Sequence, residues 1–342
     1  MMRLAVVGNP SHRRVALFTD AVRRAGLPDP EVYPWRDVLL SGRVPGPGSL
    51  VRIESPGEDA EVDRLLRELG SGRPAVPAQH GQILGTAAAF AGLRIALDRV
   101  AAGGGELLNQ PADILTMTSK PECHALLERN GIPVPPALAP ITGYAQLRAS
   151  GWRRVFVKPA YGSSASGVLA LTASGRRVSA ITSVELSGGS LFNNLRVRRY
   201  DDEPSIAAIV DLLAPDGLHV ERWFPKAVLD GRALDLRVVV IVGRPEHIVV
   251  RTSTSPMTNL HLGNARGDVA AVRAAAGETA WRAAIQTCVR VAGLFPRTLQ
   301  VGVDLMFGAR WRDHAVAEVN AFGDLLNGLD THGAQVAAIC AR

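Results

Sequence analysis

The sequence predicts an α/β protein that has a parallel sheet in its N-terminal third and becomes α+β in its C-terminal part. Strand and helix patterns alternate over residues 1–115, which is typical of a parallel sheet. Residues 152–173 and 301–319 each contain two apolar runs around a short polar or small-residue turn, which favours antiparallel hairpins. With 342 residues, of which 47% are apolar, the chain can bury a sizeable core and form two or three domains.

Composition excludes several classes of protein. The net charge of +6 is spread along the chain rather than gathered on one basic face, so we expect no nucleic-acid partner. No apolar run is long enough to cross a bilayer, and the N-terminus has no secretory signal pattern. The three cysteines are scattered, which indicates neither a disulfide framework nor a CxxC metal site. We therefore expect a cytoplasmic protein with no membrane partner. Its positive charge suits small anionic ligands, although compositional bias would produce the same charge.

The N-terminal third alternates short apolar strands with amphipathic or Ala-rich helices. The turn after its first strand lacks both the GxGxxG pattern and a Walker lysine, so neither a dinucleotide site nor a P-loop is predicted. His12, Arg13 and Arg14 at this turn either face a ligand at the carboxyl edge of the sheet or are solvated first-turn residues. We favour the second interpretation. The expected elements are strands over residues 4–8, 32–35 and 51–56, and helices over residues 13–26, 58–70 and 82–102.

Lys120 is the first candidate for ligand binding. Ser119 predicts the cap of a helix that ends near Asn130 and Gly131, and Lys120 lies in the first turn of this helix. A cation in the first turn opposes the helix dipole and gains nothing structurally, which favours a ligand role. The prolines within residues 132–136 then keep the chain extended.

Lys158 is the second candidate. The apolar run over residues 155–157 leads a strand into Lys158 and Pro159, and a loop of small residues over 161–167 follows before the next strand. Such a loop exposes backbone N–H groups and hydroxyls, which are the donors that surround a polyphosphate. Lys158 would then point a positive charge at the phosphates. The alternative is an ordinary flexible hairpin with a surface lysine.

A buried arginine is predicted in the following segment. Residues 196–204 place a basic run beside an acidic one, and we expect a solvated loop there. Residues 218–253 predict three strands, the longest over 234–242, where Asp235 and Arg237 face the same way because side chains alternate. A buried arginine needs an anion, so Arg237 either pairs with Asp235 or meets a ligand.

The most informative pattern lies within residues 301–328. Two strands flank a polar turn, with Asp304 in the first strand and Glu318 and Asn320 at the end of the second. Glu318 and Asn320 share one face, and pairing of the strands can bring Asp304 beside them. Three oxygen ligands of this kind suit Mg²⁺, which usually takes phosphate oxygens as well. The alternative is that Asp304 ends a strand and the other two residues merely precede a loop.

The order of these motifs resembles the ATP-grasp superfamily over residues 107–328. The motifs are a lysine that starts a helix before GIPVP, Lys-Pro before a Gly/Ser loop, Glu-x-x-Phe, Asp-x-Arg, TNLHLGN, and Asp followed by Glu-x-Asn. The resemblance is strongest to the branch of the ribosomal-protein glutamate ligase and related peptide ligases. It implies an ATP-grasp fold with a pre-ATP-grasp domain over 1–115, a central or lid subdomain over 116–217, and a C-terminal subdomain with the metal site over 218–342.

The resemblance also implies a function. It indicates an ATP- and Mg²⁺-dependent carboxylate–amine ligase, with Mn²⁺ as a substitute metal, that acts through an acyl phosphate on an unidentified amino-acid or peptide substrate. Dimers are common in the superfamily, so the resemblance allows a homodimer, but no interface is evident in the sequence. Two alternatives stay open: an ATP-grasp kinase, and a nucleotide-binding regulatory protein without turnover.

Site residues follow from the resemblance by position. The nucleotide would contact the two lysines, the small-residue loop and the Glu-x-x-Phe strand. Glu221 would meet the adenine amino group, and the backbones of Arg222 and Phe224 would hold the ring edge. The residues implied for the phosphates are Lys120, Lys158, Gly162, Ser163, Ser164 and Gly167.

The resemblance assigns the remaining residues to metal binding and catalysis, with one departure from the family pattern. The acid that relatives use for the ribose hydroxyls is absent; Lys226 stands in that neighbourhood, and Asp230 is the candidate substitute. The residues that follow Asn320 are AFGD, where many relatives have a proline. The resemblance therefore does not predict which residues form the acceptor pocket. His261 is more readily a loop hydrogen-bonder than a base. The implied residues are Asp304, Glu318 and Asn320 for the metal, Arg237 and Asn259 for the transferred phosphate, and His261 and Arg266 as further catalytic candidates.

Overall fold

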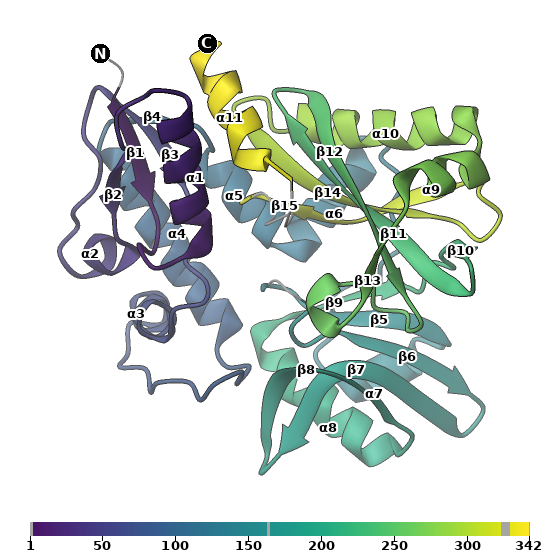
Figure 1. Ribbon diagram of the computed structural model, residues 1–342. Coiled ribbons are helices and arrows are strands. Elements are labelled where there is room, and N and C mark those ends of the chain that lie inside the picture. The colour runs from purple at the N-terminus through teal and green to yellow at the C-terminus, as the bar shows by residue number, and fades with distance from the viewer. Residues whose placement is uncertain (1–2, 163–164, 323–328, 342) are drawn as a thin grey trace.

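The computed structural model describes residues 3–162, 165–322 and 329–341, and this part of the chain forms three β-sheets (Figure 1). The first sheet is parallel, in the order β2-β1-β3-β4. Its strands are β1 (Arg3–Val7), β2 (Glu31–Tyr33), β3 (Ser49–Ile53) and β4 (Glu106–Leu107). Its helices are α1 (Arg13–Arg24), α2 (Trp35–Leu40), α3 (Ala60–Ser71) and α4 (Thr86–Ala102). Helix α1 buries Val15, Phe18 and Val22, which share one helical face.

The second sheet is antiparallel, in the order β8-β7-β6-β5-β9. Its strands are β5 (Arg154–Pro159), β6 (Leu169–Ser174), β7 (Arg177–Ser187), β8 (Ser190–Tyr200) and β9 (Leu218–Arg222). Helix α8 (Glu203–Leu213) packs on this sheet through Ile206, Ile209 and Val210, and the 3₁₀ turn η1 (Ala214–Asp216) and helix α7 (Tyr144–Ala149) adjoin it. Because β9 belongs to this sheet, the sheet extends beyond the predicted boundary at residue 217. The domain boundaries themselves stay a prediction.

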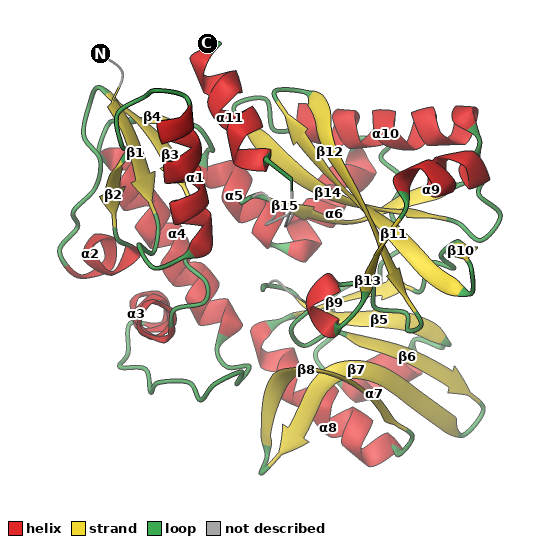
Figure 2. Cartoon of the chain, viewed as in Figure 1, coloured by secondary structure: helices red, strands yellow, loops and turns green. Residues whose placement is uncertain are grey.

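The third sheet is antiparallel, in the order β13-β12-β11-β14-β15, with β10 paired to β11. Its strands are β10 (Val228–Leu229), β11 (Arg232–Ile241), β12 (Arg244–Ser253), β13 (Ala265–Gly267), β14 (Gln300–Phe307) and β15 (His314–Asn320). Figure 2 shows α10 (Glu278–Gly293) lying along this sheet, with α9 (Val269–Ala276) beside it; η2 (Leu260–Leu262) lies in the loop before β13. The predicted hairpin over 301–319 is present as β14 and β15.

Three further helices connect these layers. Helices α5 (Pro111–Thr118) and α6 (Lys120–Arg129) lead from the first sheet to the second, and α11 (Thr331–Cys340) packs against α1, which returns the chain to its N-terminal unit (Figure 1). No described helix combines the length and hydropathy that crossing a membrane requires. The three cysteines are free thiols. The parallel order of the first sheet, with helices between its strands, confirms the predicted α/β class with a parallel N-terminal sheet.

Two predicted helix limits were wrong, and close backbone contacts explain both. Gly70 does not end α3 but lies inside it, where a Cβ atom would come 1.9 Å from the carbonyl oxygen of Ala88 on α4. The helix ends instead at Gly72, which has a left-handed backbone. Residues 82–85 do not begin α4, because the amide of Ile83 donates to Leu191 on β8.

The solvated loop predicted over residues 196–204 was also wrong. Strand β8 continues to Tyr200, and α8 starts at Glu203 with Asp202 as its N-cap. The basic residues of this run lie on an edge strand, where Arg198 pairs across to Glu185 on β7 at 2.7 Å. Such cross-strand pairs let a charged segment remain in a sheet.

Buried His332 on α11 makes stability depend on pH. Burial and the positive charges of Arg52 on β3 and of Arg14 and Arg24 on α1, opposed only by Asp330, lower the pKa of His332 from 6.5 to about 3. The unfolded chain therefore binds a proton that the folded chain does not, and stability is lost as the pH falls below 6.5. Between pH 7 and pH 5 this loss amounts to about 2 kcal/mol.

We expect His332→Asn to flatten the dependence of unfolding free energy on pH between 7 and 5, as measured by urea denaturation. His80→Gln serves as the control because His80 is exposed. An unchanged slope in His332→Asn would show that other groups cause the acid sensitivity.

Candidate functional site

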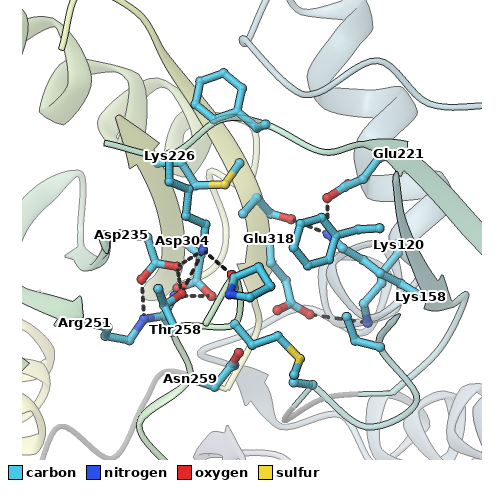
Figure 3. A pocket seen from close by; sticks show the side chains of 18 of the residues that line it. Lys120, Lys158, Glu221, Lys226, Asp235, Arg251, Thr258, Asn259, Asp304 and Glu318 are labelled. Atoms are coloured by element: carbon cyan, nitrogen blue, oxygen red, sulfur yellow. Dashed lines mark hydrogen bonds and ion pairs between the residues drawn. The ribbon is translucent and has the colours of Figure 1, made fainter. Parts of the chain in front are cut away.

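A pocket of about 80 Å³ lies between the second and third sheets (Figure 3). Its walls come from β5, β9, β11, β12, β14 and β15, together with the loop after β5 and the segment 256–259. The chain contains only three lysines, Lys120, Lys158 and Lys226, and all three line this pocket. Their side chains are only 11–13% exposed. We call this space the lysine pocket.

Lys158 points into the lysine pocket from the end of β5. Its Nζ lies 2.5 Å from Glu221 Oε1 and donates to the carbonyl oxygen of Ala317 at 3.4 Å. Strand β9 brings Glu221 there because it pairs with β5. The alternative of a surface lysine is therefore wrong.

Glu221 is buried and has a partner at each oxygen. Its second oxygen lies 3.3 Å from Nε2 of His219, two residues earlier on β9. Burial alone would raise the pKa of Glu221, but the Lys158 charge and the His219 hydrogen bond lower it to about 2. Burial lowers the pKa of His219, so its neutral ring donates to this carboxylate. Glu221 is thus ionised at neutral pH and holds Lys158 in place.

Lys120 connects three elements at the other side of the lysine pocket. Its Nζ donates to the carbonyl oxygen of Gly162 at 2.7 Å and lies 3.4 Å from Glu318 Oε1. Gly167 is needed at the end of the small-residue loop, because its φ is +75° and a Cβ atom would come 2.4 Å from Pro159. The predicted loop residues Ser163 and Ser164 lie outside the described residues.

Asp304 forms the centre of a buried group of charges. Both of its oxygens accept from Arg237 on β11, and Nη2 of Arg251 on β12 lies 3.1 Å from Oδ2. Burial alone would raise the pKa of Asp304, but the two arginines keep it below its ordinary value. Asp235 accepts from Arg251 at 2.7 Å, so the arginine that pairs with Asp235 and the aspartate that pairs with Arg237 lie on neighbouring strands rather than on β11 itself.

Of the three predicted metal ligands, Asp304 and Glu318 line the same pocket, whereas Asn320 lines a neighbouring cavity. Glu318 lies opposite Asp304 in the β14–β15 pairing, and both line the lysine pocket. Asn320 lies opposite Gly302 and lines a neighbouring cavity that Glu318 also lines. Its Nδ2 is buried and has no hydrogen-bond partner among the described residues. The chemistry of two carboxylates and an amide fits Mg²⁺. No group of three His, Cys, Asp or Glu side chains in the described chain could hold a metal, so bound Mg²⁺ would need phosphate or water oxygens as well.

Sequence reasoning did not identify the role of Lys226 in the site. Its Nζ lies 3.1 Å from Asp235 Oδ2 and 2.9 Å from the hydroxyl oxygen of Thr258, which also donates to Asp235 (Figure 3). The sequence did contain a signal for this role, because only three of its 38 basic residues are lysines. In the structure, all three lysines line this pocket. Asp230, the candidate ribose acid, lies exposed in the turn between β10 and β11 and lines none of the cavities described here.

The other predicted residues divide between two cavities. Phe224 lines the lysine pocket, whereas the exposed side chain of Arg222 stacks on Trp152 with 4.9 Å between guanidinium and ring. Asn259 lines both the lysine pocket and a cavity of about 780 Å³ between the first and third sheets, which we call the large cavity. The other predicted residues that line the large cavity are Gly162, Arg237, His261, Arg266, Glu318 and Asn320.

Comparison with solved structures identifies the fold. The ATP-grasp ligase PsnB with its minimal precursor has a TM-score of 0.56 at 17% identity, covering 100% of this chain and 99% of that chain. A RimK domain ATP-grasp protein from Sphaerobacter thermophilus has a TM-score of 0.53 at 16% identity, covering 98% of each chain. N5-carboxyaminoimidazole synthase from Aspergillus clavatus, with ADP and 5-aminoimidazole ribonucleotide, has a TM-score of 0.52 at 13% identity, covering 99% of this chain and 77% of that chain.

No protein-family model matches the sequence, and no curated protein is similar to it. The likeness to solved structures is therefore the evidence that identifies the fold. The chain has the ATP-grasp fold over its whole length, which confirms the fold that the sequence resemblance implied.

Proposed function

We propose that this chain is an ATP- and Mg²⁺-dependent ligase that joins a carboxylate to an amine and releases ADP and phosphate. The observation that carries the proposal is the convergence of three lysines and two carboxylates, Asp304 and Glu318, on one pocket of an ATP-grasp fold. Two similar structures support it: PsnB was solved with Mg and ADP, and the Aspergillus clavatus synthase with ADP. Mn²⁺ is the expected substitute metal.

In this proposal the lysine pocket binds the nucleotide. Lys120 and Lys158 neutralise the phosphates, and the loop that ends at Gly167 closes over them. The backbone near Phe224 holds the adenine edge. Glu221 meets the adenine amino group and also fixes Lys158, since the two are already in contact. Asp304, Glu318 and Asn320 would hold Mg²⁺, which would neutralise phosphate charge when bound.

The chemical steps require positioning more than acid–base groups. A substrate carboxylate oxygen attacks the γ-phosphorus in line, the bond to the bridging oxygen breaks, and ADP leaves with that electron pair. The amine then attacks the acyl carbon, phosphate leaves, and the amine loses a proton. Arg237 faces the charge that develops on the transferred group, and Asn259 lies at the boundary between the lysine pocket and the large cavity. Phosphoryl transfer would occur near this boundary, which Glu318 also lines.

Nucleotide binding requires the lysine pocket to open. Its volume of about 80 Å³ is well below the 300–1,000 Å³ typical of ligand pockets. We therefore propose that the second sheet moves away from the third when the nucleotide enters, as hinged lids do. The second sheet, which includes β9, would move as one unit against the third sheet.

Two other functions fit an ATP-grasp fold. A kinase would leave a stable phosphorylated product and need no amine, and a regulatory protein would bind ATP without releasing ADP. Glu318 favours turnover over simple binding, because a pure binder has less need of a metal-binding carboxylate. A homodimer and a cytoplasmic location stay predictions.

The function is tested by ADP release from ATP and Mg²⁺ with panels of amino acids, short peptides and amines, read by mass spectrometry. ADP release that requires both a carboxylate and an amine, with a product lighter than their sum by one water, is the expected result. A phosphorylated product formed without an amine would identify a kinase. ATP binding without ADP release by any pair would favour the regulatory alternative.

A further inference from the structure

The large cavity reaches from the first sheet to β15, the strand that carries the proposed metal ligands Glu318 and Asn320. Its N-terminal wall contains His12 and residues 55–58, which follow the carboxyl ends of β1 and β3. These two strands are neighbours in the order β2-β1-β3-β4, where the strand order reverses, and such switch points are where open α/β sheets bind ligands. Its other wall contains Glu318 and Asn320. A molecule in this cavity would therefore contact both units.

Arg14 is the notable charge on the N-terminal wall. It lies in the first turn of α1, where a cation opposes the helix dipole. Its Nε is buried without a hydrogen-bond partner, and its guanidinium has no ion pair among the described residues. His12, by contrast, is buried and lies 3.0 Å from Glu58, so it is not the solvated residue that the sequence suggested.

The acids of the cavity wall already have partners. Glu58 contacts His12, and the other two acids, Asp63 and Glu318, lie 2.8 Å from Arg67 and 3.4 Å from Lys120. None of these contacts is with Arg14. The opposite wall also presents donors, because Arg266 has no ion pair among the described residues and Asn320 Nδ2 has no acceptor.

Apolar side chains also line the cavity. They include Leu66 on α3 and Phe90 and Leu93 on α4, on its N-terminal side. Phe90 stacks on Tyr161 at the start of the small-residue loop, with 4.2 Å between ring centroids. A ligand that suits the cavity therefore has an apolar body with an anionic group at each end.

We propose that the large cavity binds an elongated dicarboxylate. Arg14 holds one carboxylate, and the second, reacting carboxylate lies beside Asn320 and Glu318. The identification of the second carboxylate as the reacting one rests on the proposed ligase function. Arg14 is thus a substrate-specificity residue contributed by the N-terminal unit, and the substrate class is a dicarboxylate rather than a simple monocarboxylic acid.

The test measures binding of succinate, glutarate, adipate and hexanoate to the full chain by calorimetry, without ATP. We expect at least one dicarboxylate to bind at least about tenfold more tightly than hexanoate, and Arg14→Met to remove that difference. Arg14→Lys should keep part of it. Arg13→Met is the matched control, because Arg13 is exposed on the same turn and does not line the cavity.

Three results would overturn the proposal: no binding by any dicarboxylate, equal binding of hexanoate, or unchanged binding in Arg14→Met. Thermal unfolding of Arg14→Met against Arg13→Met excludes misfolding as the cause of a loss. ADP release, measured on the same protein preparations after addition of ATP, Mg²⁺ and an amine, separates this inference from the ligase proposal. Arg14-dependent binding without ADP release would overturn only the ligase, whereas ADP release that ignores Arg14 would overturn only the dicarboxylate.

Discussion

Replacing Lys158 by methionine is expected to lower ADP release by at least about 100-fold and to weaken ATP binding. The change removes a cation that lies in the pocket proposed for the phosphates. It also leaves Glu221 buried without its main charge partner, which costs about 3–5 kcal/mol of folding free energy. ATP titration and urea denaturation of the variant measure the two effects.

The double variant Lys158→Met/Glu221→Gln separates the two effects. It removes the uncompensated carboxylate, so stability should recover while ATP binding stays weak. Arg153→Met is the control for loss of a cation near the same strand, because Arg153 is exposed. Full ATP affinity in Lys158→Met would contradict the assignment of the lysine pocket to the nucleotide.

Replacing Glu318 by glutamine is expected to lower Mg²⁺-dependent ADP release by on the order of 100-fold while leaving the fold intact. Its ion pair with Lys120 at 3.4 Å is partly exposed and contributes at most about 1 kcal/mol. ADP release as a function of Mg²⁺ concentration, together with the thermal unfolding temperature, measures both properties.

Two comparisons define this prediction. Asp313→Asn changes an exposed acid in the turn of the same hairpin and should leave both properties unchanged. Asp304→Asn should lose stability as well as activity, because Arg237 and Arg251 would keep only part of their buried partner. Wild-type turnover by Glu318→Gln at low Mg²⁺ would remove Glu318 from the metal site.

Local patterns predicted the parts of the site that depend on one element. Alternation along residues 301–320 predicted a hairpin with Asp304 near Glu318, and the pairing of β14 and β15 places these residues opposite each other. Lys158 followed from its place at the end of a strand before a small-residue loop. Each of these features depends only on residues that are close together in the chain, so it can be recognised from the sequence pattern alone.

Features that join distant segments were not accessible in this way. The partner of Arg237 is Asp304 on β14, although Asp235 is nearer in sequence, because strand order and register bring β14 beside β11. Lys226 and Thr258 meet at Asp235 across a gap of 32 residues. The end of strand β8 was missed because its basic residues suggested a loop, whereas Arg198 pairs across to Glu185 on β7.

The sequence by itself determined the α/β class, the terminal hairpin, the three lysines and the donor residues that suit a nucleotide and a metal. Only the tertiary structure decided which ion pairs form, that Lys226 belongs to the pocket, and that Arg14 lines a cavity shared with Asn320. The physical reason is that secondary structure follows local periodicity, whereas partners in a site depend on strand order, register and the packing of the N-terminal unit against the third sheet.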